Sequence, residues 1–134
     1  MVDVIAIPAN RSLAYWPHVR EHILKAFSRF PGEVSEEKII QNLSEGLYTL
    51  WVAWRDGPIG GLLTQIIEYS EFDSCRIVAL GGKDFEDWRE ETDRVLDLYC
   101  KFHGLKRVEF AGRKGWLRRL KNYELNRIVM VRNV

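Results

Sequence analysis

The chain has 134 residues, of which 46% are apolar, 12% aromatic and 29% charged, and these values are typical of one globular domain spanning residues 1–134. Its formal net charge of +1 hides a segregation, because residues 1–100 carry 10 Lys and Arg against 17 Asp and Glu, whereas residues 101–134 carry 10 against 2. Two cysteines without neighbouring ligands, Cys75 and Cys100, argue against a disulfide scaffold or a zinc ribbon.

Targeting and metal signals are weak. Residues 1–7 lack the charged start and long apolar run of a signal peptide, and no stretch approaches the roughly 20 apolar residues that a bilayer requires. We therefore expect a protein that is not secreted by a signal peptide, does not contact a membrane and resides in a reducing, intracellular setting. His18 and His22 have the i, i+4 spacing of metal ligands, but no third ligand is apparent, so we expect no metal.

The first half of the chain predicts a strand, two helices and a hairpin. A short strand over residues 2–7 ends at Pro8, and helical spacing follows over residues 12–30, with the regular helix expected to begin at Pro17. Ser35 offers an N-cap for a second short helix that closes at Gly46. Two apolar strands, 47–55 and 59–69, flank the turn Asp56-Gly57-Pro58, which predicts an antiparallel hairpin.

The second half predicts a strand over residues 74–80 that Gly81 and Gly82 end, followed by a helix over residues 84–103 with Gly104 as its cap. A strand over residues 105–110, a short basic helix over 113–120 and a closing strand over 124–132 complete the chain. The order β-α-α-β-β-β-α-β-α-β predicts an α/β fold with a mixed, mostly antiparallel sheet flanked by helices. In folds with this order of elements, a cleft usually lies at the end of the strand that precedes the long helix.

Several short motifs resemble those of the GNAT superfamily of acyl-CoA-dependent N-acyltransferases. They are the hairpin WVAWRDGPIGG of residues 51–61 and the segment LKNYEL of residues 120–125, and the element order is similar over nearly the whole chain. The WPH of residues 16–18, the LWVAW of residues 50–54, the Gly81-Gly82 pair and the GRKGW of residues 112–116 look like small GNAT-like proteins encoded by tailed phages. The resemblance implies a GNAT fold and an origin among virion structural genes.

The resemblance also implies a loop that wraps the pyrophosphate of coenzyme A with backbone N–H groups at the start of a helix. The matching residues here are Gly81, Gly82 and Lys83, but the second half of the glycine pattern is missing. Asp84, Glu86 and Asp87 follow at once, opposed in sequence only by Lys83. Like charges a few ångströms apart cost on the order of a few kcal/mol near a protein surface, so we expect a degenerate site and no cofactor, with acetyl-CoA as the alternative.

Acid–base residues are the second requirement that the resemblance implies. A tyrosine on the helix after the fifth strand usually protonates the departing thiolate, and Arg118 stands at about that position here. Tyr123 matches an apolar packing position. If the protein is active, the candidate bases are Glu68 and Glu109, although a carboxylate on a half-exposed strand is more often simply solvated.

A basic cluster is the strongest remaining signal, and we assign it to partner binding. It could grip an acidic protein, nucleic acid or the 3′-phosphate of coenzyme A, or it could pair with the acidic helix of the same molecule. The near-zero net charge and the scarcity of interleaved aromatic residues disfavour nucleic acid. The cluster consists of Arg113, Lys114, Trp116, Arg118, Arg119 and Lys121.

The leading hypothesis from the sequence is therefore a phage-type GNAT-fold protein without acyltransferase activity. It would act as a virion-associated structural or protein-interaction module in the host cytoplasm or the virion, bound to phage structural proteins or to itself. The alternative is an acetyl-CoA-dependent N-acetyltransferase.

Overall fold

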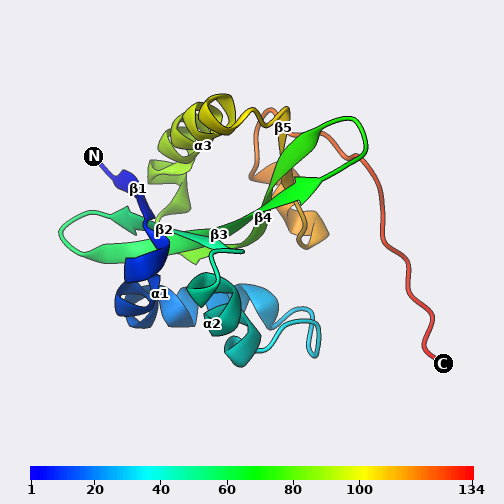
Figure 1. Cartoon of the computed structure of the whole chain (residues 1–134), viewed down its shortest axis with the longest axis horizontal. Coiled ribbons are helices and arrows are strands. Elements are labelled where there is room, and N and C mark those ends of the chain that lie inside the picture. Colours follow the sequence, from blue (N-terminus) through cyan, green and yellow to red (C-terminus); the bar gives the residue numbers. More distant parts are fainter.

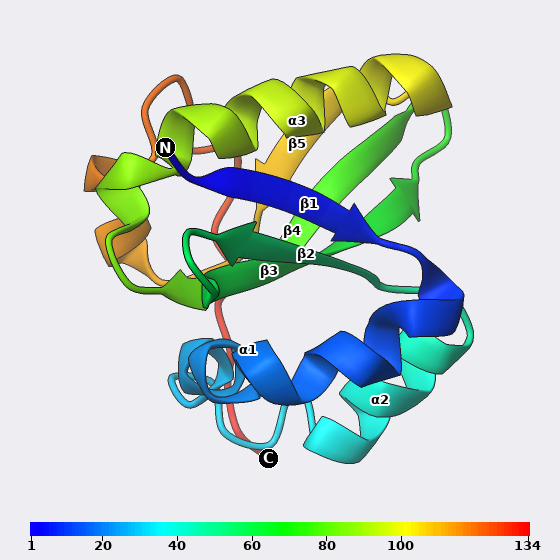
Figure 2. The ribbon, with the colours of Figure 1, turned by 90° about the vertical axis from the view of Figure 1, so that its left-hand side faces the viewer.

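A five-stranded sheet in the order β1-β2-β3-β4-β5 lies at the centre of the computed structural model, which describes residues 1–134. The first four strands pair antiparallel, and β5 pairs with β4 in parallel. Helices α1 and α2 cover one face of the sheet and α3 covers the other (Figures 1 and 2). This arrangement confirms the predicted fold class. The strands are β1 (Asp3–Ile7), β2 (Thr49–Trp54), β3 (Pro58–Glu68), β4 (Asp73–Gly82) and β5 (Arg107–Phe110), and the helices are α1 (Ser12–Phe27), α2 (Glu36–Ser44) and α3 (Arg89–His103).

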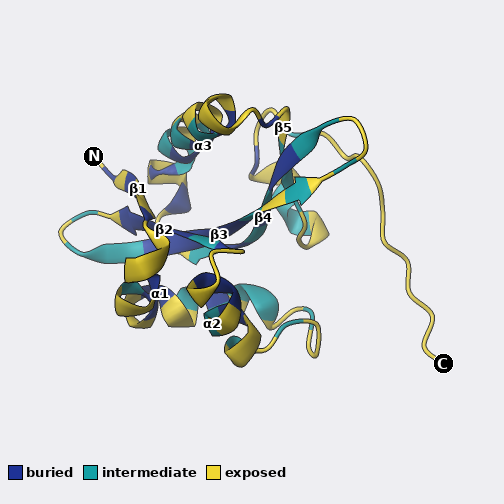
Figure 3. Cartoon of the chain, in the orientation of Figure 1, coloured by how far each residue is buried: buried dark blue, intermediate teal, exposed yellow.

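Two apolar cores lie on the two faces of the sheet. Side chains alternate across a strand, so Leu62 joins the core under α3 and its neighbour Leu63 joins the core under α1 and α2. The α3 side holds 14 buried residues and the other side 11. Figure 3 shows this burial concentrated where the helices meet the sheet. Each face therefore has its own helical cover, and the sheet is left open only along its edges.

The helix termini follow the expected chemistry, with one correction at Pro17. Ser35 caps α2 by accepting a hydrogen bond from the amide of Lys38 at 3.2 Å, and Gly104 ends α3 in the left-handed conformation with φ of 70°. The prediction that the first regular helix begins at Pro17 is wrong, because α1 runs unbroken from Ser12. Proline removes the bond to the carbonyl of Leu13, and since Leu13 is 46% exposed, water can satisfy that group.

The Gly81-Gly82 pair does not end β4 as predicted, but forms its last two residues. Gly82 pairs with Gly60 of β3 across the sheet. A Cβ on Gly60 would lie 2.9 Å from the indole of Trp88, and a Cβ on Gly81 would overlap the carbonyl of His22 on α1. The glycines therefore let a buried tryptophan and a helix approach the sheet closely from opposite sides.

The elements on either side of α3 also differ from the prediction. The α-helix begins at Arg89 rather than at residue 84, and a separate 3-10 turn, η2 (Phe85–Asp87), precedes it. Phe85 and Trp88 are buried, which fixes this turn against the sheet. The predicted basic helix over 113–120 is a shorter 3-10 helix, η3 (Lys114–Arg118).

The predicted closing strand over 124–132 does not form in this structure. Residues 124–134 pair with no strand and are exposed throughout. In Figure 1 the segment runs away from the domain. Residues 124–132 therefore have the composition of a strand but no neighbouring strand to pair with, and the sheet has five strands instead of six.

None of the helices combines the length and the apolar composition needed to cross a bilayer.

The close approach at Gly81 leads to a stability prediction. Gly81→Ala places a methyl group against the His22 carbonyl and must push α1 from the sheet, so we expect the free energy of unfolding to fall by about 1–3 kcal/mol. Gly115→Ala is the matched control, because a Cβ there meets nothing within 4 Å. Urea unfolding of both variants measures the difference, and equal stabilities would contradict the packing role assigned to Gly81.

Candidate functional site

The outer edge of β4 is open along its second half. The parallel pairing of β4 with β5 ends at Ile77 and Phe110, while β4 continues to Gly82. The register with β3 shifts between Leu63 and Thr64, which leaves Val78 as an extra residue in a β-bulge. Bulges bend a strand and are common next to active sites. From Val78 onward, no strand lies beside β4 on this side.

An aromatic wedge fills part of this opening. The Trp116 ring of η3 lies 5.4 Å from the Phe85 ring and 5.3 Å from the Phe110 ring, measured between centroids. Phe85 precedes α3 and Phe110 ends β5, so Trp116 spans the gap between those two elements. The Arg119 guanidinium stacks on Trp116 at 4.5 Å and on Phe85 at 5.3 Å. This wedge fixes η3 beside the end of β4.

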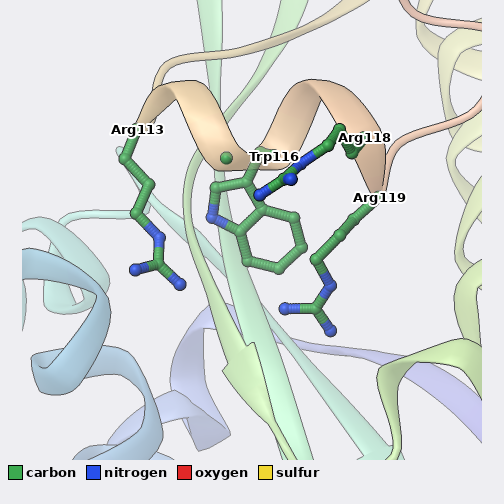
Figure 4. A pocket seen from close by; sticks show the side chains of 5 residues that line it. Arg113, Trp116, Arg118 and Arg119 are labelled. Atoms are coloured by element: carbon green, nitrogen blue, oxygen red, sulfur yellow. The ribbon is translucent and has the colours of Figure 1, made fainter.

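A pocket lies directly on the wedge. It has a volume of about 400 Å³, and it opens on the underside of η3 with the arginine side chains around the indole of Trp116 (Figure 4). No carboxylate and no tyrosine lines it. Lys114 and Lys121 of the predicted cluster are exposed but do not line it. We call this the arginine pocket, and its lining residues are Arg113, Gly115, Trp116, Arg118 and Arg119.

The loop that the sequence assigns to phosphate binding uses several of its amides internally. The Lys83 amide donates to the Ile59 carbonyl at 2.8 Å, which extends the pairing of β3 with β4. The Asp87 and Trp88 amides close the η2 turn at 2.8 and 2.9 Å, and the Trp88 indole N–H donates to the Lys83 carbonyl at 2.9 Å. These bonds, together with the packing of Gly81 and Gly82, favour a structural role for the loop.

The carboxylates around this loop are matched by three arginines, two of which lie far away in the sequence. Arg55, in the turn between β2 and β3, bonds to Asp84 at 2.8 Å and to Asp87 at 3.0 Å. The hydrogen bonds that Arg55 donates, first to Asp87 and then to Asp84, raise the pKa of its guanidinium above the usual value. Glu86 is paired with Arg89 at 3.5 Å and with Arg119 at 3.8 Å. The expectation that only Lys83 opposes these charges is therefore wrong, because the fold brings three arginines to them.

Glu109, one of the two predicted bases, is held in a polar network. Its carboxylate accepts hydrogen bonds from Arg76 at 2.8 Å and from the Tyr69 hydroxyl at 2.9 Å. Burial opposes its ionisation, but hydrogen bonds from Arg76, Ser74 and Tyr69 outweigh that effect and hold the pKa of Glu109 below its usual value. A carboxylate so stabilised is a weak base, and it faces Arg76 rather than the arginine pocket.

The other predicted site residues lie apart from one another. Glu68 is exposed at the end of β3, where its backbone lies opposite Asp73 of β4. From Asp73 to Gly82, β4 advances by nine residue steps. At the usual rise per strand residue this is roughly 30 Å. Tyr123 packs on the core under α3, and burial raises the pKa of its hydroxyl. The structure therefore does not bring Glu68 and Glu109 together with Gly81, Gly82 and Lys83.

No protein-family model matches the sequence, and no curated protein does. Solved acetyltransferase structures, in contrast, match it over nearly its whole length. An aminoglycoside acetyltransferase from an uncultured soil metagenomic sample superposes with a TM-score of 0.67 and 15% identity, covering 99% of this chain and 95% of its own. A GCN5-related N-acetyltransferase from Ralstonia eutropha superposes with a TM-score of 0.65 and 12% identity, covering 100% and 99%. The chain has the GNAT fold.

A third similar structure is named as a complex with a ligand. It is a predicted acetyltransferase with acetyl-CoA from Clostridium acetobutylicum, which superposes with a TM-score of 0.62 and 9% identity and covers 98% of this chain and 96% of its own. Identities this low support the fold alone. The phage resemblance suggested by the sequence motifs finds no counterpart among these structures and stays a prediction.

Sequence reasoning missed two parts of this GNAT-fold site. Arg55 was not singled out, because its partners Asp84 and Asp87 lie 29 and 32 residues further along the chain. Phe85 falls within the helix predicted over residues 84–103, whereas in the structure it precedes α3 and forms one side of the aromatic wedge. An arginine in a hairpin turn, followed two strands later by an acidic turn, is the one sequence signal for these ion pairs.

The Glu109 network predicts a pH-dependent stability difference. Because the folded pKa is lowered, the ionised carboxylate stabilises the fold fully above its unfolded pKa, and this contribution is lost as the pH falls through the lowered value. We expect Glu109→Gln to lower the free energy of unfolding at pH 7 by about 1–2 kcal/mol. Urea unfolding between pH 7 and pH 3 should show this gap closing below about pH 4. A gap that stays constant with pH would contradict the network.

Proposed function

We propose that the protein is an acyl-CoA-dependent N-acyltransferase that holds the phosphate groups of its acyl donor in the arginine pocket. The observation that carries the proposal is the arginine pocket of η3, which the contact of Trp116 with Phe85 holds next to the turn before α3 and beside the open end of β4 in a GNAT fold. The neighbour from Clostridium acetobutylicum, named as a complex with acetyl-CoA, supports the choice of donor.

The side chains of the pocket suit a phosphate ligand. Guanidinium groups present N–H donors in a planar fork that matches phosphate oxygens two at a time. Arg113, Arg118 and Arg119 supply three such groups around one indole. Because the Lys83, Asp87 and Trp88 amides are already bonded within the chain, these arginines would do what backbone amides do in a glycine-rich phosphate loop.

The ion pairs around α3 remove the main objection to an anionic donor. The sequence suggested that Asp84, Glu86 and Asp87 would repel phosphate. Arg55 now neutralises two of these carboxylates, and Arg89 and Arg119 share the third. An incoming phosphate would therefore meet compensated charges rather than three free carboxylates, and the unmatched cations of η3 would dominate the field.

The reaction would transfer the acyl group to an amine. The amine nitrogen attacks the thioester carbonyl, a C–N bond forms as the C–S bond breaks, the nitrogen loses a proton to solvent, and coenzyme A leaves as the thiolate. Glu109 is committed to Arg76 and Tyr69, so the amine should already be neutral near pH 7. An α-amino group, with a pKa of about 7.7–8.0, meets this condition far better than a lysine side chain at about 10.4.

Acetyl-CoA titration tests the proposal. We expect binding by calorimetry, and transfer at pH 8 to a peptide with a free α-amine by mass spectrometry. Arg113→Ala, Arg118→Ala and Arg119→Ala should each weaken binding by about tenfold or more, because a lost charge-assisted hydrogen bond costs about 1.5–3 kcal/mol.

The matched control is Arg11→Ala. Arg11 is an exposed arginine that does not line the pocket, and it lies in the 3-10 turn η1 (Ala9–Arg11) before α1, at the opposite end of the sheet from η3 (Figure 2). Its affinity for acetyl-CoA should equal that of the wild type. If the wild type shows no binding, or the pocket variants bind as well as Arg11→Ala, the proposal fails.

A second prediction concerns charge compensation by Arg55. Arg55→Ala should weaken acetyl-CoA binding at low salt, although Arg55 does not line the pocket, because Asp84 and Asp87 become uncompensated. Adding Asp84→Asn and Asp87→Asn to the same chain should restore the affinity. Weakened binding that the asparagines do not restore would show that Arg55 acts in another way.

The internal bonding of the Lys83 loop also favours a second candidate function. In that case the protein is a GNAT-fold interaction module without transferase activity, and the arginine pocket holds an acidic segment of a protein partner. The virion-associated role inferred from the phage resemblance belongs to this candidate and stays a prediction. Failure of acetyl-CoA to bind in the calorimeter, with intact folding, is the result that favours it.

A further inference from the structure

The segment formed by residues 124–134 exposes an unusual amount of apolar surface for an unpaired chain. Ile128, Val129, Met130 and Val131 form an uninterrupted apolar run with exposed fractions of 69%, 83%, 88% and 84%. Three of these four residues are β-branched, which favours a strand. Figure 3 shows the segment exposed along its whole length. A run of this kind in water is a segment that lacks its partner strand.

The sheet has an open edge next to the origin of this segment. β5 pairs only with β4, so the N–H and C=O groups on its other side have no strand to bond. Val108 and Phe110 on β5 are half-buried. A depression of about 190 Å³ lies beside β5 and α3, and its lining combines apolar side chains with charged ones. The apolar residues are Cys100, Leu105 and Val108, and the charged residues are Asp97, Lys101, Lys106 and Arg107. The edge therefore offers backbone partners, and the surface beside it is apolar in part.

The path of the chain points away from its own β5. Leu120 is 7% exposed and Tyr123 packs on the core under α3, so the chain is fixed to the domain up to that residue. Beyond it, the segment extends away from the domain (Figure 1). Eleven extended residues reach at most about 36–40 Å, which is enough to lie along the sheet of an adjacent molecule.

We propose that residues 124–134 add a sixth strand to the β5 edge of a second copy of this chain, and that two copies exchange these segments reciprocally. In a two-fold dimer of identical chains, each chain supplies one segment and one open edge, so both segments and both edges are paired. Backbone pairing at β5 gives the register, and apolar side chains from the run 128–131 cover the depression beside α3. The exchange closes the open edge of both sheets, which would otherwise invite uncontrolled pairing.

Light scattering after size exclusion tests the exchange. The full chain should elute with about twice its 15.7 kDa mass at micromolar concentration. A chain truncated after Tyr123 should be a folded monomer. Val129→Pro should also be monomeric, since proline cannot donate a ladder hydrogen bond. Asn133→Pro, outside the apolar run, is the matched control and should remain a dimer.

Hydrogen exchange separates this proposal from its competitors. Amides of β5 and of residues 128–131 should be protected in the full-length dimer, and the β5 amides should lose part of that protection on truncation. A monomeric full chain with a protected segment would mean that the strand folds onto its own β5, which overturns the proposal. A dimer that survives truncation, or a monomer with an unprotected segment, overturns it as well.

Discussion

The candidate site depends on the gap that opens where β4 and β5 stop pairing. Parallel pairing stops at Ile77 and Phe110, yet β4 continues to Gly82 through its ladder with β3. Trp116 enters the gap between Phe85 and Phe110 and fixes η3 there. A basic segment that would otherwise be a solvated turn thus forms a pocket around the indole of Trp116. The chemistry proposed for the protein rests on this wedge.

The arginines around the wedge form two groups, those that are paired with carboxylates and those that are not. Arg55, Arg89 and Arg119 meet the carboxylates of the turn before α3, and Arg113 and Arg118 line the pocket without a carboxylate partner. The segregation seen along the sequence is therefore partly cancelled inside the fold and partly kept at the pocket. A ligand with several negative charges and an aromatic base is the natural complement to guanidinium groups around an indole.

The sequence predicted the parts of the fold that local chemistry determines. The Ser35 cap, the turn at Asp56-Gly57 and the Gly104 terminus each depend on a few adjacent residues. The prediction from the sequence failed where contacts with residues far away in the sequence determine the structure. Gly81 and Gly82 stay in β4 because Gly60, Trp88 and α1 pack against them. The pairing of Arg55 with Asp84 needs the folded hairpin, and the strand expected over residues 124–132 has no neighbour in its own domain.

The central claim is that an acyl-CoA phosphate group binds at Trp116 rather than on the Gly82 loop, and an NMR titration with coenzyme A tests it directly. The indole N–H groups of Trp16, Trp51 and Trp88 are hydrogen-bonded inside the protein and act as internal references. The account predicts a saturable shift of the Trp116 indole signal, assigned with Trp116→Phe, while the signals of Trp16, Trp51 and Trp88 stay in place. A Trp116 signal that does not move at saturating coenzyme A would contradict it.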